Sequence, residues 1–551
     1  MHRKELLLSA VLIILFGFSV YLNAINGKFV WDDNLFLVEN KYIKDGTGLM
    51  EIFTRDIGAG AGIRFNYYRP LQLSSYKLEY AIWGLDWRVY HITNIFLHIL
   101  VALCVFYLAF MLFGKKLAAL LAGLIFVLHP VQTESVVYIS SRADLLCALF
   151  FMASFILYIR YIKNRSAPAY LLMIAVYLLA LFSKENALMF IGVLFVYHYA
   201  FRERLVLREL LPVLGVTISY IFFRDAVLKT TMYGVTDINA ILLRMPGFFR
   251  AVTGYLRLLF FPFGLHFDYG YKIFRFNEPS VIIGMILVFV LIIYAALNRR
   301  KNAAIFFSVC WFLVMLIPVS NIYPRTAFYM AEHHLYIPLV GFAFILSDYL
   351  SRLCRKRGFK AAALSIITAL LVFYGYSTIR QNNYWLEPVD FYKRTLEFSP
   401  DSVVAHYNLG KEYERIGDQP AAILMYKKAI ELQPGYDNAY NNLGVIYSRL
   451  DKKEEAIKMF SKVLEINPES VPAYINLGVL HYGLGQKGEA LDFFKKARDI
   501  NPEDAATYYN LAVVYYDQKE YGLAAMNFNR AASLGHKVPP GLLESLQPYR
   551  K

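Results

Sequence analysis

The stretch "AHYNLGKEYERIGDQPAAILMYKKAIELQP", residues 405–434, decides the fold of the second half of this chain. A proline closes each unit of its pattern, at Pro400, Pro434, Pro468 and Pro502. The triplet Asn-Leu-Gly, or Asn-Leu-Ala in the last unit, begins at Asn408, Asn442, Asn476 and Asn510. Alanines recur at the same period, at Ala422, Ala456, Ala490 and Ala524. A period of 34 residues with small residues between helices is typical of a solenoid of helix pairs.

This is the pattern of tetratricopeptide repeats (TPRs). It predicts four repeats over residues 401–536. Residues 381–400 are expected to form a partial repeat or connector. Residues 537–551 are expected to cap the array, because the end of a solenoid needs a polar outer face.

The four recurring asparagines, on the first helix of each predicted repeat, have two interpretations. They could form a ladder of amides that holds an extended acceptor peptide, similar to the concave-face asparagines of O-GlcNAc transferase. They could instead bond neighbouring helices. The residues concerned are Asn408, Asn442, Asn476 and Asn510.

The first half of the chain has a different composition. The 551 residues are 58% hydrophobic and only 18% charged, whereas a soluble chain carries roughly 25% charged residues. Apolar runs of this length can span a bilayer as helices. Eleven such runs are predicted, at 5–24, 92–113, 117–131, 143–160, 168–183, 187–201, 209–224, 280–297, 303–319, 335–351 and 361–378. The sequence therefore predicts an all-α protein, with a polytopic membrane helical bundle over 1–380 followed by the TPR solenoid.

Basic residues suggest the orientation of this bundle. Lys and Arg cluster in every second connection, at 115–116, 160–165, 202–208, 299–301 and 352–357. Cytoplasmic loops carry such clusters, so we expect a cytoplasmic N-terminus, a retained signal anchor and, after eleven spans, repeats on the outer side. The stretch 247–267, which carries Arg250 and Arg257, is expected to be an interfacial or re-entrant helix on the outer side.

The N-glycosylation sequon bears on the compartment. The only sequon, Asn164-Arg165-Ser166, falls in a predicted cytoplasmic loop. This favours a bacterial inner membrane with periplasmic repeats over the alternative, an endoplasmic reticulum membrane with luminal repeats.

Several partners are disfavoured by composition. The net charge of +15 suggests nucleic acid, but much of it lies in the loop clusters, so we predict no nucleic-acid partner. The four cysteines contain no CxxC pair, which argues against a disulfide framework and a zinc site. His333 and His334 are adjacent, and neighbouring side chains on a helix point about 100° apart. We therefore predict no metal site, and the sequence does not indicate a divalent metal.

The stretch "NGKFVWDDNLF", residues 26–36, places two adjacent carboxylates just beyond the first apolar run. A carboxylate at the lipid boundary could take a proton from an acceptor hydroxyl, and partial burial would raise its pKa. Asp32 and Asp33 are therefore the predicted catalytic residues. The alternative is a solvated turn in which an aspartate caps a short helix.

Other polar residues collect in the predicted outer segments and are candidates for binding the donor phosphate or substrate. They are Arg64, Arg69, His91, His129, Glu134, Arg142, Asp144, Lys184, Glu185, His333 and His334. Arginine grips phosphate in a bidentate manner. The alternatives are an aromatic–arginine belt for 64–69, hydrogen bonds between helices for His91, a re-entrant helix for 129–146 and a local pair of Lys184 with Glu185.

Six motifs carry a resemblance to a known family. They are "FVWDD" (29–33), "YRPL" (68–71), "YHITNIFLH" (90–98), "HPVQTESVVYISSRADLL" (129–146), "SKENAL" (183–188) and "AEHHLYIPLVGF" (331–342). With the repeats that follow, the chain resembles the transmembrane-and-TPR-containing O-mannosyltransferases and their bacterial relatives, in the GT-C glycosyltransferase superfamily.

The resemblance implies a function. The donor would be a polyprenyl-phosphate-linked sugar, which is dolichyl-phosphate mannose in eukaryotic members. One of Asp32 and Asp33 would be the base of a single inverting displacement, and the other would orient the acceptor. Arg69, Arg142 and Lys184 would stabilise the leaving phosphate. His333 and His334 stand where members often carry arginine, which leaves the sugar unassigned.

We therefore predict a membrane glycosyltransferase. It would move a hexose such as mannose from a polyprenyl-phosphate sugar to a hydroxyl, expected to be Ser or Thr of a polypeptide held by the TPRs. The alternative is a membrane-anchored TPR scaffold for protein–protein interaction without catalysis.

Overall fold

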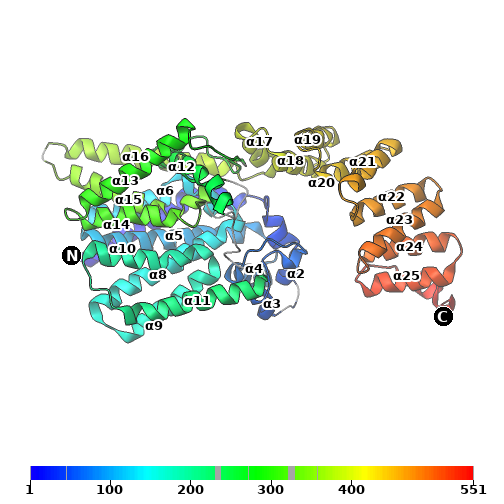
Figure 1. Cartoon of the computed structure of the whole chain (residues 1–551), viewed down its shortest axis with the longest axis horizontal. Helices are drawn as coiled ribbons and strands as arrows, with labels where there is room; N and C mark the ends of the chain where they lie inside the picture. Colours follow the sequence, from blue (N-terminus) through cyan, green and yellow to red (C-terminus); the bar gives the residue numbers. More distant parts are fainter. Residues whose placement is uncertain are drawn as a thin grey trace. The chain divides into compact units, whose positions relative to one another are not determined.

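The computed structural model describes residues 2–44, 46, 48–229, 238–270, 272–320, 329–356 and 358–549. Every regular element among these residues is a helix, which confirms the all-α prediction (Figure 1). The chain divides into two compact units, Met1–Ser399 and Pro400–Lys551.

The first unit is built from long apolar helices and several short ones. The long helices are α1 (His2–Tyr21), α5 (Trp87–Phe113), α6 (Lys116–Leu128), α8 (Arg142–Asn164), α9 (Ala167–Ser183), α10 (Phe190–Phe201), α11 (Leu207–Leu228), α12 (Ile238–Phe260), α13 (Pro279–Asn298), α14 (Ala303–Leu316), α15 (Leu339–Leu353) and α16 (Lys360–Asn383). The shorter helices are α2 (Lys41–Lys44), α3 (Leu49–Phe53), α4 (Pro70–Trp83), α7 (Thr133–Val137) and α17 (Pro388–Phe398). A helix lies in each of the eleven predicted apolar ranges.

The predicted number of membrane spans is nevertheless wrong. Six of the described helices are long and apolar enough to cross a membrane, or seven if the bent pair Lys116–Leu128 and Pro130–Val137 is one span. The apolar helices at 167–183, 185–201 and 303–316 are shorter. At 1.5 Å per residue, 17 residues reach only about 25 Å, less than the hydrocarbon thickness of about 30 Å. An apolar run in a sequence does not show where the helix ends.

The break after α6 illustrates such an end. His129 precedes Pro130 and has φ −71° and ψ 123°, an extended conformation that stops the helix. A residue before proline is pushed out of the helical region by the proline ring. The two helices on either side of the break meet at 50°. The polar segment 129–142 that follows leads into α8.

The second unit is an array of helix pairs, α18 to α25, in which each helix packs against its successor (Figure 1). The four pairs are α18 (Val403–Arg415) with α19 (Gln419–Leu432), α20 (Asp437–Arg449) with α21 (Lys453–Ile466), α22 (Val471–Gly483) with α23 (Lys487–Ile500), and α24 (Ala505–Asp517) with α25 (Tyr521–Ser533). Ala422, Ala456, Ala490 and Ala524 are fully buried. The short helix α26 (Pro540–Ser545) follows, and Leu546 packs against the last repeat.

All but the last residue of the connector predicted at 381–400 lie in the first unit. Residues up to Ser399 belong to the first unit, and Pro400 begins the second. Trp385, Phe391 and Tyr392 are buried within the first unit, each 3% exposed. The helix α17 is therefore a part of the membrane unit.

Replacing Gly478 with alanine is expected to loosen the third repeat. A Cβ at this position would lie 2.5 Å from Phe494 Cε1, so the ring would have to move. Overpacking of this kind costs about 1–3 kcal/mol. A Cβ at Gly483, on the same helix, would meet no atom of the described residues within 4 Å, so Gly483→Ala is a matched control. The half-life of the repeats under limited proteolysis of the full-length protein should fall for Gly478→Ala alone. Equal half-lives would contradict the expectation.

Candidate functional site

A cavity of about 300 Å³ lies in the first unit, where segments far apart in the sequence meet. It is lined by Trp31, Asp32, Phe36, Tyr67, Arg69, Glu134, Tyr138, Ser140, Ser141, Asp144, Lys184, Glu185, Asn186, Phe267, Pro318, Val319, Ala331, His333 and His334. Eight of these were predicted as site residues from the sequence: Asp32, Arg69, Glu134, Asp144, Lys184, Glu185, His333 and His334. The polar loop segments therefore converge on one hollow.

The two adjacent aspartates have different surroundings. Asp33 is 1% exposed and is held on both carboxylate oxygens. Its Oδ1 accepts hydrogen bonds from the backbone N–H (2.8 Å) and the hydroxyl (2.5 Å) of Ser140, and its Oδ2 accepts from the N–H of Val30 (3.1 Å). Asp32 is half-buried and lines the cavity. The carboxylate that can meet a ligand is thus that of Asp32.

Burial shifts the acidity of both groups. It raises the pKa of Asp32 to about 6, against the lowering effects of Tyr138 and Arg69. It raises the pKa of Asp33 to about 7, against the lowering effect of its hydrogen bonds to Ser140 and Val30. Desolvation disfavours the charged form of a carboxyl group. A general base is most efficient when its pKa lies near the working pH, so Asp32 is suited to that task.

Two basic side chains line the cavity, and they differ in whether an acidic side chain already pairs with them. Lys184 is 7% exposed, and its Nζ contacts both carboxylate oxygens of Asp144, at 2.7 and 2.8 Å. The predicted alternative partner was Glu185, so the structure gives Lys184 a different ion pair. The Arg69 guanidinium lies over the Tyr67 ring at 4.7 Å, and its buried Nε has no hydrogen-bond partner among the described residues. Arg69 is therefore better placed to bind an anion.

The adjacent histidines bind different partners, although their rings pack edge to face with centroids 4.6 Å apart. His333 donates its backbone N–H to Glu134 (3.0 Å), and its Nδ1 lies 2.5 Å from the other Glu134 oxygen. Nδ1 of His334 lies 3.0 Å from the hydroxyl of Tyr255. Within the described ranges, no group of three or more His, Cys, Asp or Glu side chains is arranged to hold a metal ion.

Three predicted residues lie away from the cavity. Arg64 donates to the carbonyl of Leu228 at the end of α11. His91 is buried, and its Nε2 contacts the carbonyl of Gly27 at 2.9 Å. His129 Nε2 contacts the carbonyl of Leu259 at 3.1 Å. All three connect loops and helices, and Arg64 is exposed and lines a second cavity together with Arg55 and Asp56.

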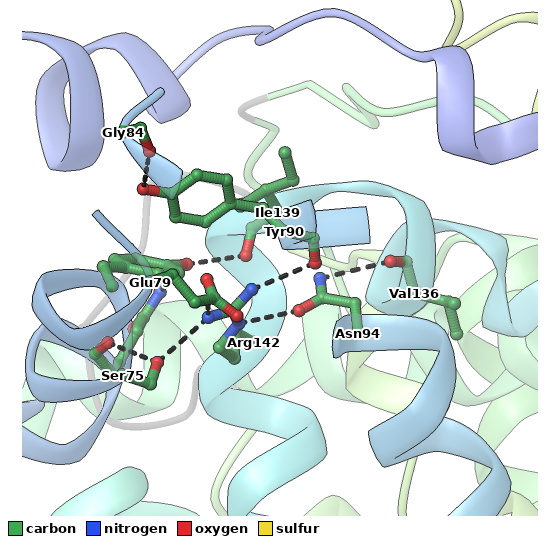
Figure 2. Close-up of polar contacts among 10 residues, drawn as sticks. Ser75, Glu79, Gly84, Tyr90, Asn94, Val136, Ile139 and Arg142 are labelled. Atoms are coloured by element: carbon green, nitrogen blue, oxygen red, sulfur yellow. Dashed lines mark hydrogen bonds and ion pairs between the residues drawn. The ribbon is translucent and has the colours of Figure 1, made fainter. Parts of the chain in front are cut away.

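Arg142 also lies outside the cavity lining, inside a buried polar cluster (Figure 2). It is 0% exposed and forms an ion pair with Glu79 at 2.6 Å. It also donates to Asn94 (2.8 Å), the carbonyl of Tyr90 (3.0 Å) and Ser75 (3.1 Å). The predicted role on the leaving phosphate does not fit this position, because the guanidinium is already bound. It joins α4 and α5 to the start of α8.

An aromatic wall was not predicted from the sequence. Trp31 and Phe267 line the cavity with ring centroids 4.8 Å apart, and Tyr138 packs against Phe267 at 5.5 Å. Asp32 donates its backbone N–H to the hydroxyl of Tyr138 at 3.2 Å. The only signal in the sequence was the position of Trp31 next to the acidic pair.

The repeat asparagines are half-buried in the second unit. Asn442 donates to the hydroxyls of Tyr407 (3.2 Å) and Tyr426 (3.3 Å), and Asn476 donates to Asn441 (3.0 Å). These bonds fit the interpretation in which the amides join neighbouring helices. Asn408 and Asn510 make no side-chain hydrogen bond within the described part of the chain.

Two family models match the repeat unit. The tetratricopeptide repeat family matches residues 438–470 and 471–504. The TPR repeat family matches residues 411–451. These matches confirm that the second unit contains TPRs.

Curated relatives extend across most of the chain. A protein O-mannosyl-transferase of Caenorhabditis elegans is 29% identical over 422 residues, covering 73% of this chain and 59% of that protein. Protein O-mannosyl-transferase TMTC4 of Mus musculus is 25% identical over 466 residues, covering 72% and 63%. Protein O-mannosyl-transferase TMTC1 of Homo sapiens is 25% identical over 476 residues, covering 73% and 52%. The resemblance expected from the six motifs is confirmed.

This chain spans less than two thirds of the length of these relatives. Among solved structures, the crystal structure of MamA is 26% identical and covers 27% of this chain and 86% of that chain, with a TM-score of 0.25.

Proposed function

We propose that this chain, as a relative of the protein O-mannosyl-transferases, is an integral membrane glycosyltransferase. It moves a sugar, a hexose such as mannose, from a polyprenyl-phosphate sugar to a hydroxyl of an acceptor polypeptide. The observation that carries this proposal is the cavity. It combines a half-buried carboxylate with an arginine whose buried Nε has no partner among the residues that the structure describes, beside helices apolar enough to span a membrane.

The cavity residues suggest how the transfer proceeds. The acceptor oxygen attacks the anomeric carbon of the sugar and forms the new C–O bond, while the hydroxyl proton moves to Asp32. The bond between the anomeric carbon and the phosphate oxygen breaks, and polyprenyl phosphate leaves with the electron pair. Arg69 stabilises the charge that develops on this phosphate. Lys184 adds a weaker contribution, because Asp144 already compensates its charge.

Asp33 and Ser140 fix the loop that carries the proposed base, Asp32. The three hydrogen bonds to the Asp33 carboxylate fix the backbone on both sides of it, at Val30 and at Ser140. The next residue in the chain, Asp32, is thereby fixed relative to the segment 138–141. Such preorganisation is a large part of catalytic power.

The orientation proposed from the basic loops fits the ion pairs of the first unit. Lys115 pairs with Asp348 at 2.7 Å, and Lys116 pairs with Glu5. These pairs gather the start of α1, the start of α6 and the end of α15 at one end of the bundle, while Asp144 at the start of α8 lies in the cavity at the other. We propose that the basic end is cytoplasmic and that the cavity and the repeats face the outer side, in a bacterial inner membrane or, alternatively, the endoplasmic reticulum membrane.

Sugar transfer from a panel of radiolabelled polyprenyl-phosphate sugars tests this proposal. Membranes containing the full-length protein are compared with membranes that lack it and with the Asp32→Asn variant. Label that enters polypeptide only with the wild-type protein supports the proposal and identifies the sugar. Equal labelling in all three samples, with normal protein levels, would overturn it and favour the TPR scaffold.

The rate of transfer is expected to depend on pH through Asp32. A base acts in its deprotonated form, so the rate should rise with pH and level off above about 6, the raised pKa of this group. The positive charge of Arg69 favours ionisation of Asp32 and so lowers its pKa, against the effect of burial. Arg69→Gln should therefore move the midpoint to higher pH as well as reduce the rate. A pH–rate profile of both proteins checks this, and an unchanged midpoint in the variant would contradict it.

A further inference from the structure

Trp31, the residue before Asp32, has an unusual backbone conformation. Its φ is +51°, in the left-handed region that bulky side chains rarely adopt. Such a conformation persists only where the surrounding structure enforces it, and it clusters at functional sites. The conformation determines how the peptide between residues 31 and 32 is oriented. The N–H of that peptide donates to the Tyr138 hydroxyl at 3.2 Å.

Aromatic rings from α17 and from the 264–270 segment hold Trp31 in place. Its ring centroid lies 4.8 Å from that of Phe267, 5.9 Å from Tyr392 and 6.3 Å from Phe391. Phe391 also packs against Phe267 at 5.4 Å and against Trp385 at 4.7 Å. Phe391 and Tyr392 belong to α17 and are each 3% exposed. The rings thus form one connected cluster that packs against Trp31.

Hydrogen bonds and an ion pair at the two ends of α17 connect it to the segment that carries Trp31 and to the segment that carries Phe267. Before α17, the carbonyl of Leu386 accepts the N–H of Lys28 at 3.0 Å, and Glu387 pairs with the Lys28 ammonium at 2.8 Å. After α17, the hydroxyl of Ser399 donates to the carbonyl of Asp268. The ends of α17 therefore bind the segment that leads to Asp32 and the segment that carries Phe267.

We propose that Trp31 is a positioning residue for Asp32, and that Phe391 and Tyr392 of α17 keep Trp31 in its left-handed conformation. This inference rests on the proposed role of Asp32 as the base. Without the surrounding rings, residue 31 would relax to negative φ, and the Asp32 carboxylate would turn away from the cavity. The helix α17, which directly precedes the repeat unit in the chain, is thereby a part of the catalytic apparatus.

Two substitutions of the same residue separate this role from simple packing. Trp31→Gly and Trp31→Ala both remove the ring, and with it any contact of the ring with the substrate. Glycine adopts positive φ without strain and alanine does not. We expect kcat to be about tenfold higher for the glycine variant than for the alanine variant. Equal kcat values, or a faster alanine variant, would overturn the proposal.

The helix contact is tested by Phe391→Leu. Phe391 does not line the cavity, so kcat should fall by about tenfold while the KM for donor stays unchanged. Phe391→Tyr, which keeps the ring, should retain most of the rate. The control is Phe494→Leu, which removes a buried ring from the repeat unit. If Phe391→Leu has the same kcat as this control, α17 does not position the site.

Carboxyl labelling distinguishes a failure of this inference from a failure of the proposed function. The full-length proteins are treated with a water-soluble carbodiimide and an amine, and the labelling of Asp32 is measured by mass spectrometry. The alanine variant should differ from wild type more than the glycine variant does, even if none of the proteins transfers sugar. Equal labelling of the two variants would overturn the positioning role, whereas absent transfer by wild type would overturn the proposed function alone.

Discussion

Replacing Asp32 with asparagine is expected to reduce kcat for sugar transfer by about 10²- to 10⁴-fold, the usual contribution of a general base. Asparagine has nearly the same shape as aspartate but cannot accept the acceptor proton. Donor binding depends on Arg69 and the cavity walls, so KM for the donor should change little. Steady-state kinetics with the purified full-length protein measure both parameters.

The loss should not reflect unfolding. The pKa of Asp32 is raised to about 6 from an ordinary value of 3.8. Its ionisation therefore lowers the free energy of unfolding as the pH rises above 3.8, and the full loss is reached above about pH 6. A neutral asparagine removes this disadvantage at pH 7, and the variant should be at least as stable as wild type. Glu39→Gln, at an exposed acid in the same segment, is the matched control and should keep full activity. An Asp32→Asn protein as active as this control would exclude Asp32 as the base.

Asp33→Asn provides a contrast. Its carboxylate accepts three hydrogen bonds and does not line the cavity. An amide places an N–H₂ donor against the N–H of Val30 or of Ser140, which leaves a buried donor unsatisfied. The amount of folded protein should therefore fall together with activity, whereas Asp32→Asn should reduce activity alone.

Replacing Arg142 with methionine is expected to destabilise the first unit by about 3–5 kcal/mol, the cost of breaking a buried ion pair from one side. The variant leaves the charge of Glu79 buried without its partner, and Asn94 and Tyr90 lose a donor (Figure 2). Thermal unfolding of the detergent-solubilised protein should show a lower midpoint. Transfer should fall too, because Arg142 begins the helix that follows Ser140 and Ser141.

Two further variants show whether the buried charge is the cause. Arg160→Met, at an exposed arginine on the same helix, should change the free energy of unfolding by no more than about 0.5 kcal/mol. Arg142→Met combined with Glu79→Gln removes the unpaired charge and should recover part of the lost stability. If Arg142→Met unfolds at the same temperature as Arg160→Met, the cluster does not stabilise this unit.

Much of the site could be predicted from residue types, but its contacts could not. Asp32, Arg69 and Lys184 were identified because charged groups in outer segments beside apolar helices need a reason to be there. The partner of Lys184 is Asp144, 40 residues earlier, and not its neighbour Glu185. Arg142 was expected on the phosphate, but Glu79, 63 residues earlier, binds it. A charged side chain in a sequence does not show which opposite charge the fold will bring to it.

The sequence by itself determined the repeat unit, the membrane character of the first unit and the presence of an acidic pair behind the first apolar run. Repeats can be read directly because each helix pair contacts only its neighbours in the chain, so their packing is a local property. The tertiary structure decided how many helices are long enough to span, and which aspartate faces the cavity. It also placed Ser140 on Asp33, 107 residues away, and Glu134 on His333, 199 residues away. Such contacts depend on the relative translation and rotation of packed helices. Side-chain packing across many helices fixes both.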